Sequence, residues 1–421
     1  MLNSGYEILN IKQMNNNKTR FQELEQGIFS DRINDVPRSF IREILKIAIS
    51  KNIISFAGGL PNRGLFPIEE LKIATAKIFD EAGMEALQYS DTEGYKPLRE
   101  FIAERYLIKQ GIKVSPANIL ITSGSQQGLD LLGKTILNEG DEVIIEQPGY
   151  LGAIQAFSVY RAEFQPVPMT KEGIDTTVLS KVLKKSKAKL MYTVPEFQNP
   201  SGISYSNFTR TEVAKIISGK KLLLIEDCPY SDLRFSGIST TSFYNLVPDQ
   251  TVMLGTFSKT IVPSFRLGWI VAQDPLMDRL ITAKQASDLH TNYFVQRIIY
   301  QYLMDNNCDL HIAKICEVYG RQKNTMIESI KKYFPKNVTY TVPEGGMFLW
   351  ITLPKGISSM DLFDLAIKQD VAFVPGNPFY TDGKQSYNTL RLNFSCSDVF
   401  AIEEGIRRLG RAIHDLISKV S

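Results

Sequence analysis

The chain has 421 residues and a mass of 47.5 kDa, a length that predicts two or three domains. The 48 Lys and Arg residues nearly balance the 45 Asp and Glu residues, which leaves a formal net charge of +3. This balance argues against a nucleic-acid partner, because a general polyanion binder shows a basic excess or stripe. No apolar run approaches the ~18 residues that span a membrane, so no membrane association is expected.

The cysteines and histidines exclude two further classes of protein. Four cysteines occur without any CxxC pair, so we expect no disulfide framework and a reducing, cytoplasmic location. The three histidines lie far apart in sequence, and no metal site is expected. Hydrophobic residues make up 43% of the chain, enough for a large core. The composition therefore predicts a soluble multidomain protein of a class rich in enzymes.

The first part of the chain is predicted to be an extension followed by helices. Residues 1–37 lack the basic and apolar regions of a signal peptide. Apolar periodicity predicts helices at Ser39–Ser50, Glu69–Glu81 and Tyr95–Gln110. The glycine-rich segment Ser55–Pro61 separates the first helix from the second and cannot be helical throughout.

From Ile119 onward, short apolar runs alternate with helical patterns. Such runs are typical of strands buried on both faces of a mostly parallel sheet, whose ligands bind beyond the carboxyl ends of the strands. Helices are predicted between several of them, at Leu129–Leu137 and Arg210–Ile217. The predicted strands are Ile119–Thr122, Glu142–Glu146, Lys189–Val194, Lys221–Glu226, Thr251–Gly255 and Leu267–Ala272.

The carboxyl-terminal third predicts long helices and then a smaller α+β unit. Residues from Pro275 to about Phe334 carry no strand pattern. The segment Asn337–Leu353 and the short apolar runs Val371–Val374 and Leu390–Phe394 follow, with helices at Met360–Lys368 and Val399–Ile417.

Three predicted strands end in residues with binding chemistry. After Ile119–Thr122, the sequence Ser123-Gly124-Ser125-Gln126-Gln127-Gly128 begins a helix, where open N–H groups and the helix dipole favour an anion. Taken alone, this segment is explained more simply as an ordinary strand–helix turn with a serine cap. Tyr150 and Asn199 follow two other strands, and each also has a simpler explanation, as a packed aromatic or a turn former.

The remaining strand ends carry charge. Asp227 ends an apolar strand, which is costly without a partner, and Tyr230 follows it. Thr256, Ser258 and Lys259 follow the next strand, near Arg266. Lys259 is either a Schiff-base nucleophile or a solvated surface lysine. Together these strand ends match what pyridoxal phosphate requires: an amine, an acid for its ring nitrogen, phosphate donors and a flat ring partner.

The sequence resembles the fold-type I, class I/II aminotransferases over roughly residues 38–415. It looks most like the branch of 2-aminoadipate and kynurenine aminotransferases, to which the carboxyl-terminal domains of MocR-type regulators are related. The resemblance is carried by Phe56-Ala57-Gly58-Gly59-Leu60-Pro61, Leu87-Gln88-Tyr89-Ser90, Gly124-Ser125-Gln126-Gln127-Gly128, Asn199-Pro200-Ser201-Gly202, Glu226-Asp227-x-x-Tyr230, Gly255-Thr256-Phe257-Ser258-Lys259, Arg266-Leu267-Gly268-Trp269 and Arg391-Leu392-Asn393-Phe394.

This resemblance implies an α/β fold with a mostly parallel seven-stranded sheet in a large domain and a smaller α+β domain. The implied divisions are an extension at 1–37, small-domain segments at 38–75 and 326–421, and a large pyridoxal-phosphate-binding domain at 76–325. It also implies a homodimer with shared active sites, because Tyr89 would reach the phosphate of the neighbouring subunit.

The resemblance assigns a role to each site residue. Lys259 would form the aldimine with the cofactor, and Asp227 would pair with the pyridinium nitrogen. Tyr230 and Asn199 would bind the ring oxygen, and Tyr150 would stack on the ring. The phosphate would be held by Ser125, Gln126, Ser258 and Arg266, with Thr256 in place of the serine common in relatives. Arg391 would bind the substrate α-carboxylate, helped by backbone around Gly59.

The implied reaction is transamination, from an L-amino acid to a 2-oxo acid such as 2-oxoglutarate, in a ping-pong cycle. The donor is expected to be 2-aminoadipate, an aromatic amino acid or kynurenine, or the range is broad. A lyase or decarboxylase on the same fold is an alternative. A non-catalytic MocR-like sensor is another, although the ~38 residues before the match show no helix-turn-helix pattern.

Overall fold

The computed structural model describes residues 28–34, 36, 44, 53–381 and 387–420. Its largest sheet runs through the middle of the chain, with strand order β2-β9-β8-β7-β6-β3-β4-β5. The pairs from β8 across to β4 are parallel, whereas β9 runs antiparallel to both β2 and β8. The strands are β2 (Ile119–Thr122), β3 (Glu142–Gln147), β4 (Glu163–Thr170), β5 (Gly173–Ile174), β6 (Leu190–Thr193), β7 (Leu223–Asp227), β8 (Thr251–Thr256) and β9 (Gly268–Val271).

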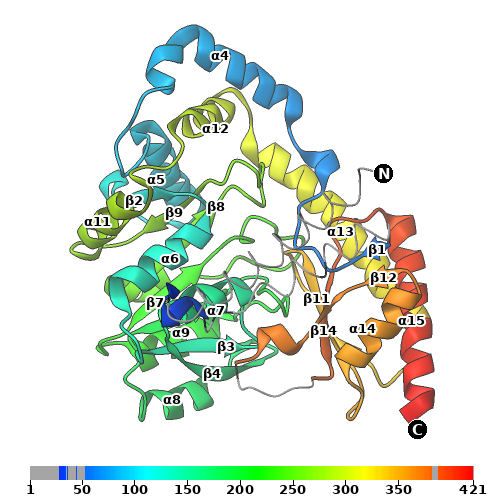
Figure 1. Ribbon diagram of the computed structural model, residues 1–421. Coiled ribbons are helices and arrows are strands. Elements are labelled where there is room, and N and C mark those ends of the chain that lie inside the picture. Colours follow the sequence, from blue (N-terminus) through cyan, green and yellow to red (C-terminus); the bar gives the residue numbers. More distant parts are fainter. Residues whose placement is uncertain (1–27, 35, 37–43, 45–52, 382–386, 421) are drawn as a thin grey trace, which may run out of the picture.

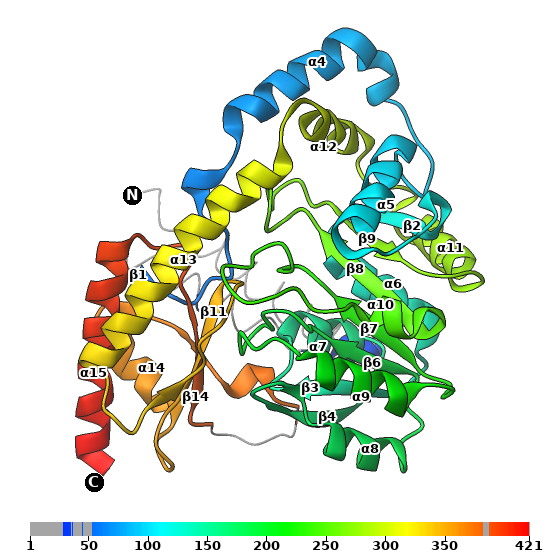
Figure 2. The same cartoon turned by 180° about the vertical axis from the view of Figure 1, so that it is seen from behind.

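Helices cover both faces of this sheet, as Figures 1 and 2 show from opposite sides. Successive side chains of a strand point to opposite faces, so Val143 and Ile145 join one apolar cluster and Ile144 joins another. The first face is covered by α6 (Ser125–Ile136), α7 (Leu151–Ser158) and α11 (Leu276–Asp288). The second is covered by α5 (Lys96–Gln110), α8 (Thr176–Leu183), α9 (Asn207–Ile217), α10 (Phe243–Leu246) and α12 (Tyr293–Asp305).

A smaller unit combines segments from both ends of the chain. Its antiparallel sheet has the order β10-β11-β14-β13, and β1 (Ile54–Ser55) pairs in parallel with β12 (Val371–Ala372). The other strands are β10 (Thr339–Tyr340), β11 (Phe348–Thr352), β13 (Val374–Pro375) and β14 (Thr389–Asn393). The helices α13 (Cys308–Tyr333), α14 (Ser359–Lys368) and α15 (Val399–Val420) pack around them, and a short α2 (Asp31–Asn34) precedes β1.

The six predicted strands of the large sheet are present within two residues of their predicted bounds, and the helical stretch after Pro275 is confirmed. Two strands were missed. β4 contains Pro166 and Pro168, which do not suggest a strand. The sheet has eight strands and not the seven expected, because the chain turns back after Thr170 and Gly173–Ile174 pairs with the end of β4. Of the helix predicted at Ser39–Ser50, only Ile44 lies within the described residues.

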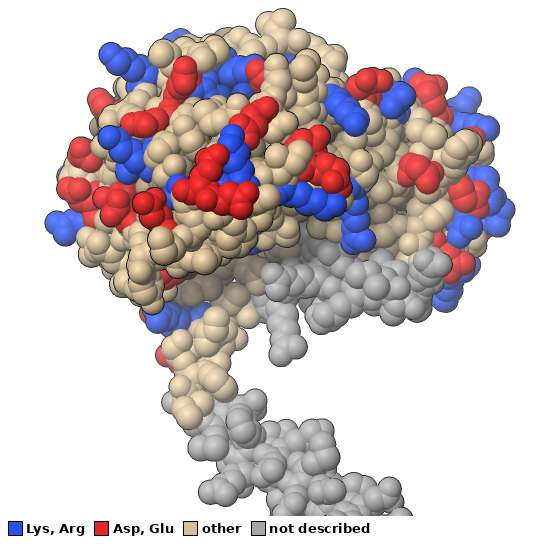
Figure 3. Space-filling view, turned by 90° about the horizontal axis from the view of Figure 1, so that it is seen from above, with Lys and Arg blue, Asp and Glu red and all other residues tan. Residues whose placement is uncertain are grey.

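The helix predicted at Glu69–Glu81 is longer than expected. It is α4 (Ile68–Ala86), whose backbone leaves helical geometry at Ala82 and then resumes. Among the described residues, no helix has the length and apolar character needed to cross a membrane. On the face in Figure 3, acidic and basic side chains lie interspersed, in keeping with the balanced composition.

Candidate active site

A cavity of about 430 Å³ lies at the carboxyl ends of β3, β6, β7 and β8 and at the start of α6. This is the position that the parallel-sheet rule predicts for a ligand. Every predicted site residue except Tyr89 lines it: Gly59, Ser125, Gln126, Tyr150, Asn199, Asp227, Tyr230, Thr256, Ser258, Lys259, Arg266 and Arg391. Sequence positions from 59 to 391 therefore meet in one place.

Lys259 follows β8 and points into the cavity, where its Nζ donates a hydrogen bond of 2.8 Å to the Gly59 carbonyl oxygen. Burial lowers the pKa of Lys259 to about 8, and the nearby charges of Arg391 and Arg266 lower it as well. An amine with this pKa exists partly uncharged near neutral pH. Lys259 can therefore act as a nucleophile and as a carrier of protons.

Asp227 ends β7 and is buried against the same cavity. Its Oδ2 accepts a hydrogen bond of 2.7 Å from the Tyr192 hydroxyl, while Oδ1 has no hydrogen-bond partner among the described residues. Burial raises the pKa of Asp227 to about 7, although the bond from Tyr192 works in the opposite direction. An unpaired buried carboxylate oxygen of this kind fits a cationic N–H group of a ligand.

Arg391 lies in the middle of β14, opposite Trp350 of β11. It donates from Nη1 to Asn199 Oδ1 and from Nη2 to the Ala57 carbonyl oxygen, both at 2.7 Å. Its Nε has no hydrogen-bond partner among the described residues. Burial lowers the pKa of Arg391 to about 10, so the side chain stays cationic at neutral pH. A buried arginine with a free N–H is suited to a carboxylate ligand.

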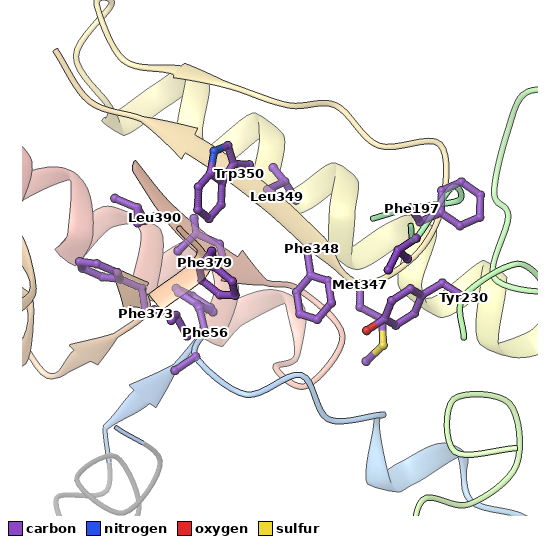
Figure 4. Close-up of a cluster of buried hydrophobic side chains, with 14 of the residues drawn as sticks. Phe56, Phe197, Tyr230, Met347, Phe348, Leu349, Trp350, Phe373, Phe379 and Leu390 are labelled. Carbon is purple, nitrogen blue, oxygen red and sulfur yellow. The ribbon is translucent and has the colours of Figure 1, made fainter. Parts of the chain in front are cut away.

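Two aromatic rings flank the Arg391 guanidinium group, Phe348 of β11 and Phe379 of the short helical turn Asn377–Phe379. The guanidinium carbon lies 4.4 Å from the centre of the Phe348 ring and 5.3 Å from that of Phe379. Phe348 also meets the ring of Tyr230 edge to face at 5.8 Å, an arrangement visible in Figure 4. Tyr230 in turn accepts a hydrogen bond of 3.4 Å from Asn199 Nδ2, so these groups form one connected set.

The turn between β2 and α6 has the geometry of an anion site. Gly124 has a φ of 78°, a backbone conformation that favours glycine, and a Cβ there would push aside the Arg266 guanidinium group. Helix α6 begins at Ser125, which leaves its first N–H groups open toward the cavity. Arg266 approaches Ser258 Oγ at 3.4 Å and the Ser123 carbonyl oxygen at 3.4 Å.

Thr256 supports this turn from the side of β8. Its hydroxyl lies 3.0 Å from both the Leu267 carbonyl oxygen and Ser258 Oγ, and it accepts the N–H of Ser258 at 3.1 Å. The hydroxyl is therefore engaged within the protein, and it orients Ser258 toward the cavity.

Tyr150 is also where the sequence analysis expected it, at the cavity wall after β3. Its ring lies roughly parallel to that of Tyr192, at 26° and with the ring centres 6.4 Å apart. A Cβ at Gly152 would collide with the Tyr150 ring, so this glycine permits the position of the ring. Burial raises the pKa of Tyr150 to about 12, which keeps the hydroxyl protonated.

Sequence reasoning missed Tyr192 and the remaining lining residues, which are Leu151, Gly152, Gln155, Val194 and Pro229. Tyr192 did carry a signal: it is the one aromatic hydroxyl in the apolar strand Leu190–Thr193, and a buried hydroxyl requires a partner. The others carried none.

Tyr89 lies away from the cavity. Its side chain is 79% exposed, and its ring meets the edge of His290 at 5.8 Å. The described residues contain no group of three or more His, Cys, Asp or Glu side chains that could hold a metal ion.

The fold and these groups together define a pyridoxal-phosphate enzyme of fold type I. The lysine, the half-paired buried carboxylate, the anion-binding turn and the flanking tyrosine ring match the four demands of this cofactor. A family model for class I and II aminotransferases matches residues 51–409, and the chain belongs to this family. It is a pyridoxal-phosphate-dependent aminotransferase.

Individual relatives agree with this. The chain is 41% identical to a 2-aminoadipate transaminase of Thermus thermophilus, over 91% of this chain and 96% of the relative. It is 38% identical to aromatic-amino-acid aminotransferase 1 of Thermococcus litoralis, over 93% and 95%. A solved α-aminoadipate aminotransferase from Thermus thermophilus, in complex with N-(5′-phosphopyridoxyl)-L-leucine, is 40% identical with a TM-score of 0.86, over 93% of this chain and 98% of that one.

Proposed function

We propose that this aminotransferase moves the amino group of an L-amino acid to 2-oxoglutarate or a similar 2-oxo acid, with Lys259, Asp227 and Arg391 as its central residues. The observation that carries the proposal is that three groups with complementary chemistry line one cavity. A lysine with a lowered pKa and a buried carboxylate with an unpaired oxygen line the same space as a buried arginine.

The cofactor would be held at three points. Ser125, Gln126, Ser258 and Arg266 would bind its phosphate, supported by Thr256. Tyr150 would lie against the ring, Asp227 would keep the ring nitrogen protonated through its free Oδ1, and Asn199 and Tyr230 would bind the ring oxygen. When bound, pyridoxal phosphate supplies an aldehyde that reacts with amines and a ring that draws electrons from the substrate α-carbon.

The protein residues supply the rest of the chemistry. Arg391, with its free Nε and the backbone around Gly59, would bind the α-carboxylate of the amino acid and later that of the 2-oxo acid. Lys259 Nζ would move a proton between the substrate α-carbon and the cofactor. Since both substrates use the same arginine in turn, the cycle would be ping-pong.

The test of this assignment is Lys259→Ala, with the exposed Lys181→Ala on α8 as the matched control. Glutamate formation from an amino acid and 2-oxoglutarate should fall by about four orders of magnitude or more in Lys259→Ala and stay unchanged in Lys181→Ala. The visible absorbance of the bound cofactor should also change in Lys259→Ala alone. Full turnover in that variant would overturn the proposal.

The donor is proposed to be 2-aminoadipate or an aromatic amino acid, kynurenine included. The support is the identity of about 40% to relatives named for the first two substrates. A screen of L-2-aminoadipate, L-phenylalanine, L-tyrosine, L-kynurenine and L-leucine with 2-oxoglutarate tests this. Release of carbon dioxide or ammonia without glutamate would favour a decarboxylase or lyase instead.

We also propose a homodimer in which Tyr89 serves the partner's phosphate site. The exposed position of Tyr89 outside its own cavity supports this. In the proposed domain division, residues 38–75 and 326–421 form the small domain and residues 76–325 form the large domain. A cytoplasmic location is proposed on the ground that all four cysteines are free thiols.

A further inference from the structure

Lys284 of α11 is a lysine whose side chain is completely buried. A buried ammonium group is costly unless all of its N–H groups are satisfied. Lys284 Nζ has three acceptors: Asp288 Oδ1 at 2.7 Å, Thr291 Oγ1 at 2.9 Å and Gln127 Oε1 at 3.1 Å. This lysine does not line the cavity and has no part in the chemistry described above.

Its partners are attached to the anion-binding turn. Gln127 lies in the first turn of α6, where Oε1 accepts the Ser123 N–H at 2.7 Å and Nε2 donates to Asp288 Oδ2 at 2.7 Å. Thr291 Oγ1 lies 3.2 Å from the Ile121 carbonyl oxygen of β2. The ion pair of Lys284 and Asp288 therefore connects α11 with both the end of β2 and the beginning of α6.

Ser123 is held through both of its backbone groups. Its N–H is bound by Gln127 from within this cluster, and its carbonyl oxygen is approached by Arg266 from the cavity side. The open N–H groups of Ser125 and Gln126 follow within three residues. A shift of Gln127 would therefore move the groups that face the phosphate, without removing any of them.

We propose that Lys284 is a positioning residue for the cofactor phosphate: with Asp288 it fixes Gln127, and through Gln127 the Ser123–Gln127 turn. The inference rests on the proposed assignment of that turn to the phosphate. Its specific consequence is that loss of Lys284 weakens binding through the phosphate and leaves binding through the aldehyde and ring unaffected.

The experiment compares pyridoxal 5′-phosphate with pyridoxal, which lacks the phosphate, on the full-length chain freed of cofactor. Lys284→Met removes the ammonium but keeps an unbranched apolar side chain. Lys134→Met is the matched control, because Lys134 also connects α6 to α11, through Ser287 Oγ at 2.6 Å, yet it lies far along α6 from the turn.

Lys284→Met should raise the Kd for pyridoxal phosphate about tenfold or more and leave the Kd for pyridoxal within about twofold of wild type. Lys134→Met should change neither value. Equal weakening of both ligands, or no weakening of either, would overturn the inference.

Two outcomes separate the inference from the proposal on which it rests. If wild-type protein binds pyridoxal as tightly as pyridoxal phosphate, the phosphate assignment itself fails. If wild type prefers pyridoxal phosphate and Lys284→Met keeps that preference, only the role of Lys284 fails. Should Lys284→Met not fold, Asp288→Asn at a partly exposed position decides instead, and it must show the same phosphate-specific loss.

Discussion

Asp227 depends on the hydroxyl of Tyr192, which donates to Oδ2 and leaves Oδ1 for the ligand. Tyr192→Phe removes this donor and keeps the ring. We expect the acid limb of the kcat profile to move to higher pH by about one unit, because a hydrogen bond to a carboxylate contributes about 1.5 kcal/mol. KM should change little.

Tyr205→Phe is the control for this prediction, since Tyr205 donates to the buried carboxylate of Glu146 at 2.8 Å and lies outside the cavity lining. Its profile should keep the wild-type acid limb. Identical shifts in the two variants would mean that Tyr192 acts through general packing.

Asp227 also predicts how stability depends on pH in the cofactor-free protein. Its folded-state pKa of about 7 lies above the ordinary value of 3.8, so the folded state retains a proton that the unfolded state has lost. The favourable contribution of Asp227 is therefore complete below about pH 4 and is lost as the pH rises toward 7, on the order of 4 kcal/mol in all.

Asp227→Asn should abolish the part of the pH-dependent loss of folding stability that comes from Asp227. Urea unfolding of cofactor-free wild type and variant at pH 5 and pH 8 measures it. The variant should gain stability relative to wild type at pH 8. Glu146, whose pKa burial raises to about 8, is present in both proteins; because the charge of Asp227 is the smallest of the causes of that shift, most of its contribution cancels in the comparison. A difference that is the same at both pH values would contradict the prediction.

At the residue scale, the sequence identified the groups that carry chemistry better than the groups that support them. Lys259 and Asp227 stand out because each ends or follows an apolar strand, whereas Arg391 was identified only through the resemblance to aminotransferases. The roles of Tyr192 and Lys284 depend on hydrogen bonds to residues that are distant in sequence. Tyr192 bonds to Asp227, 35 positions away, and Lys284 bonds to Gln127, 157 positions away. Such pairings depend on strand order, which local periodicity does not contain.

At the scale of elements, β11 and β14 together place the carboxylate-binding arginine. The guanidinium carbon of Arg391 in β14 lies 4.4 Å from the centre of the Phe348 ring in β11. Phe348→Leu should raise KM for the amino donor roughly fivefold to tenfold, because the cation–π contact that fixes the guanidinium is lost. Steady-state kinetics with a fixed 2-oxo acid measure the change, and kcat should stay within about twofold.

Phe373→Leu controls for packing. Phe373 is equally buried in the smaller unit and meets Phe363 rather than Arg391. Both variants should lose about 1 kcal/mol of stability, but only Phe348→Leu should alter KM. A similar rise of KM in both would assign the effect to a loosened core.

The elements themselves were largely predictable because the large sheet is buried on both faces and its strands are short apolar runs. The exceptions have physical reasons. In β4, prolines occupy a strand near the sheet edge, where missing N–H donors are tolerated. In α4, the break at Ala82 falls directly after the predicted end at Glu81, and the helix then resumes to Ala86.

At the scale of the whole molecule, the active site depends on bringing together the two ends of the chain. The parallel pair β1–β12 fixes the segment before Gly59, and this segment meets β14 where Phe56 accepts from the Asn393 N–H and Ala57 accepts from Arg391. Nothing in the local sequence around residue 57 or 391 indicates this contact. The resemblance to aminotransferases implied only that Arg391 and the backbone around Gly59 serve the same substrate carboxylate, and the hydrogen bond from Arg391 to Ala57 shows how the two segments are held together.

Helix α4 and the residues just after it expose large apolar side chains on their outer surface, a feature that marks interaction surfaces. These side chains are Ile68, Ile73, Phe79, Met84, Leu87 and Tyr89. Met84, 93% exposed, is the most accessible of them. We expect this surface to be the interface of the proposed homodimer. Met84→Glu should then weaken dimerisation at least tenfold, because a carboxylate would be desolvated there.

Sedimentation equilibrium measures this association, and Phe400→Glu is the control, since Phe400 is 83% exposed on α15, a helix that packs against α13 and α14. Phe400→Glu should remain as dimeric as wild type. Met84→Glu should also release pyridoxal phosphate faster, because Tyr89 would no longer reach the partner's site. A Met84→Glu protein that dimerises like Phe400→Glu would place the interface elsewhere, whereas a monomer that keeps its cofactor would remove Tyr89 from the shared site.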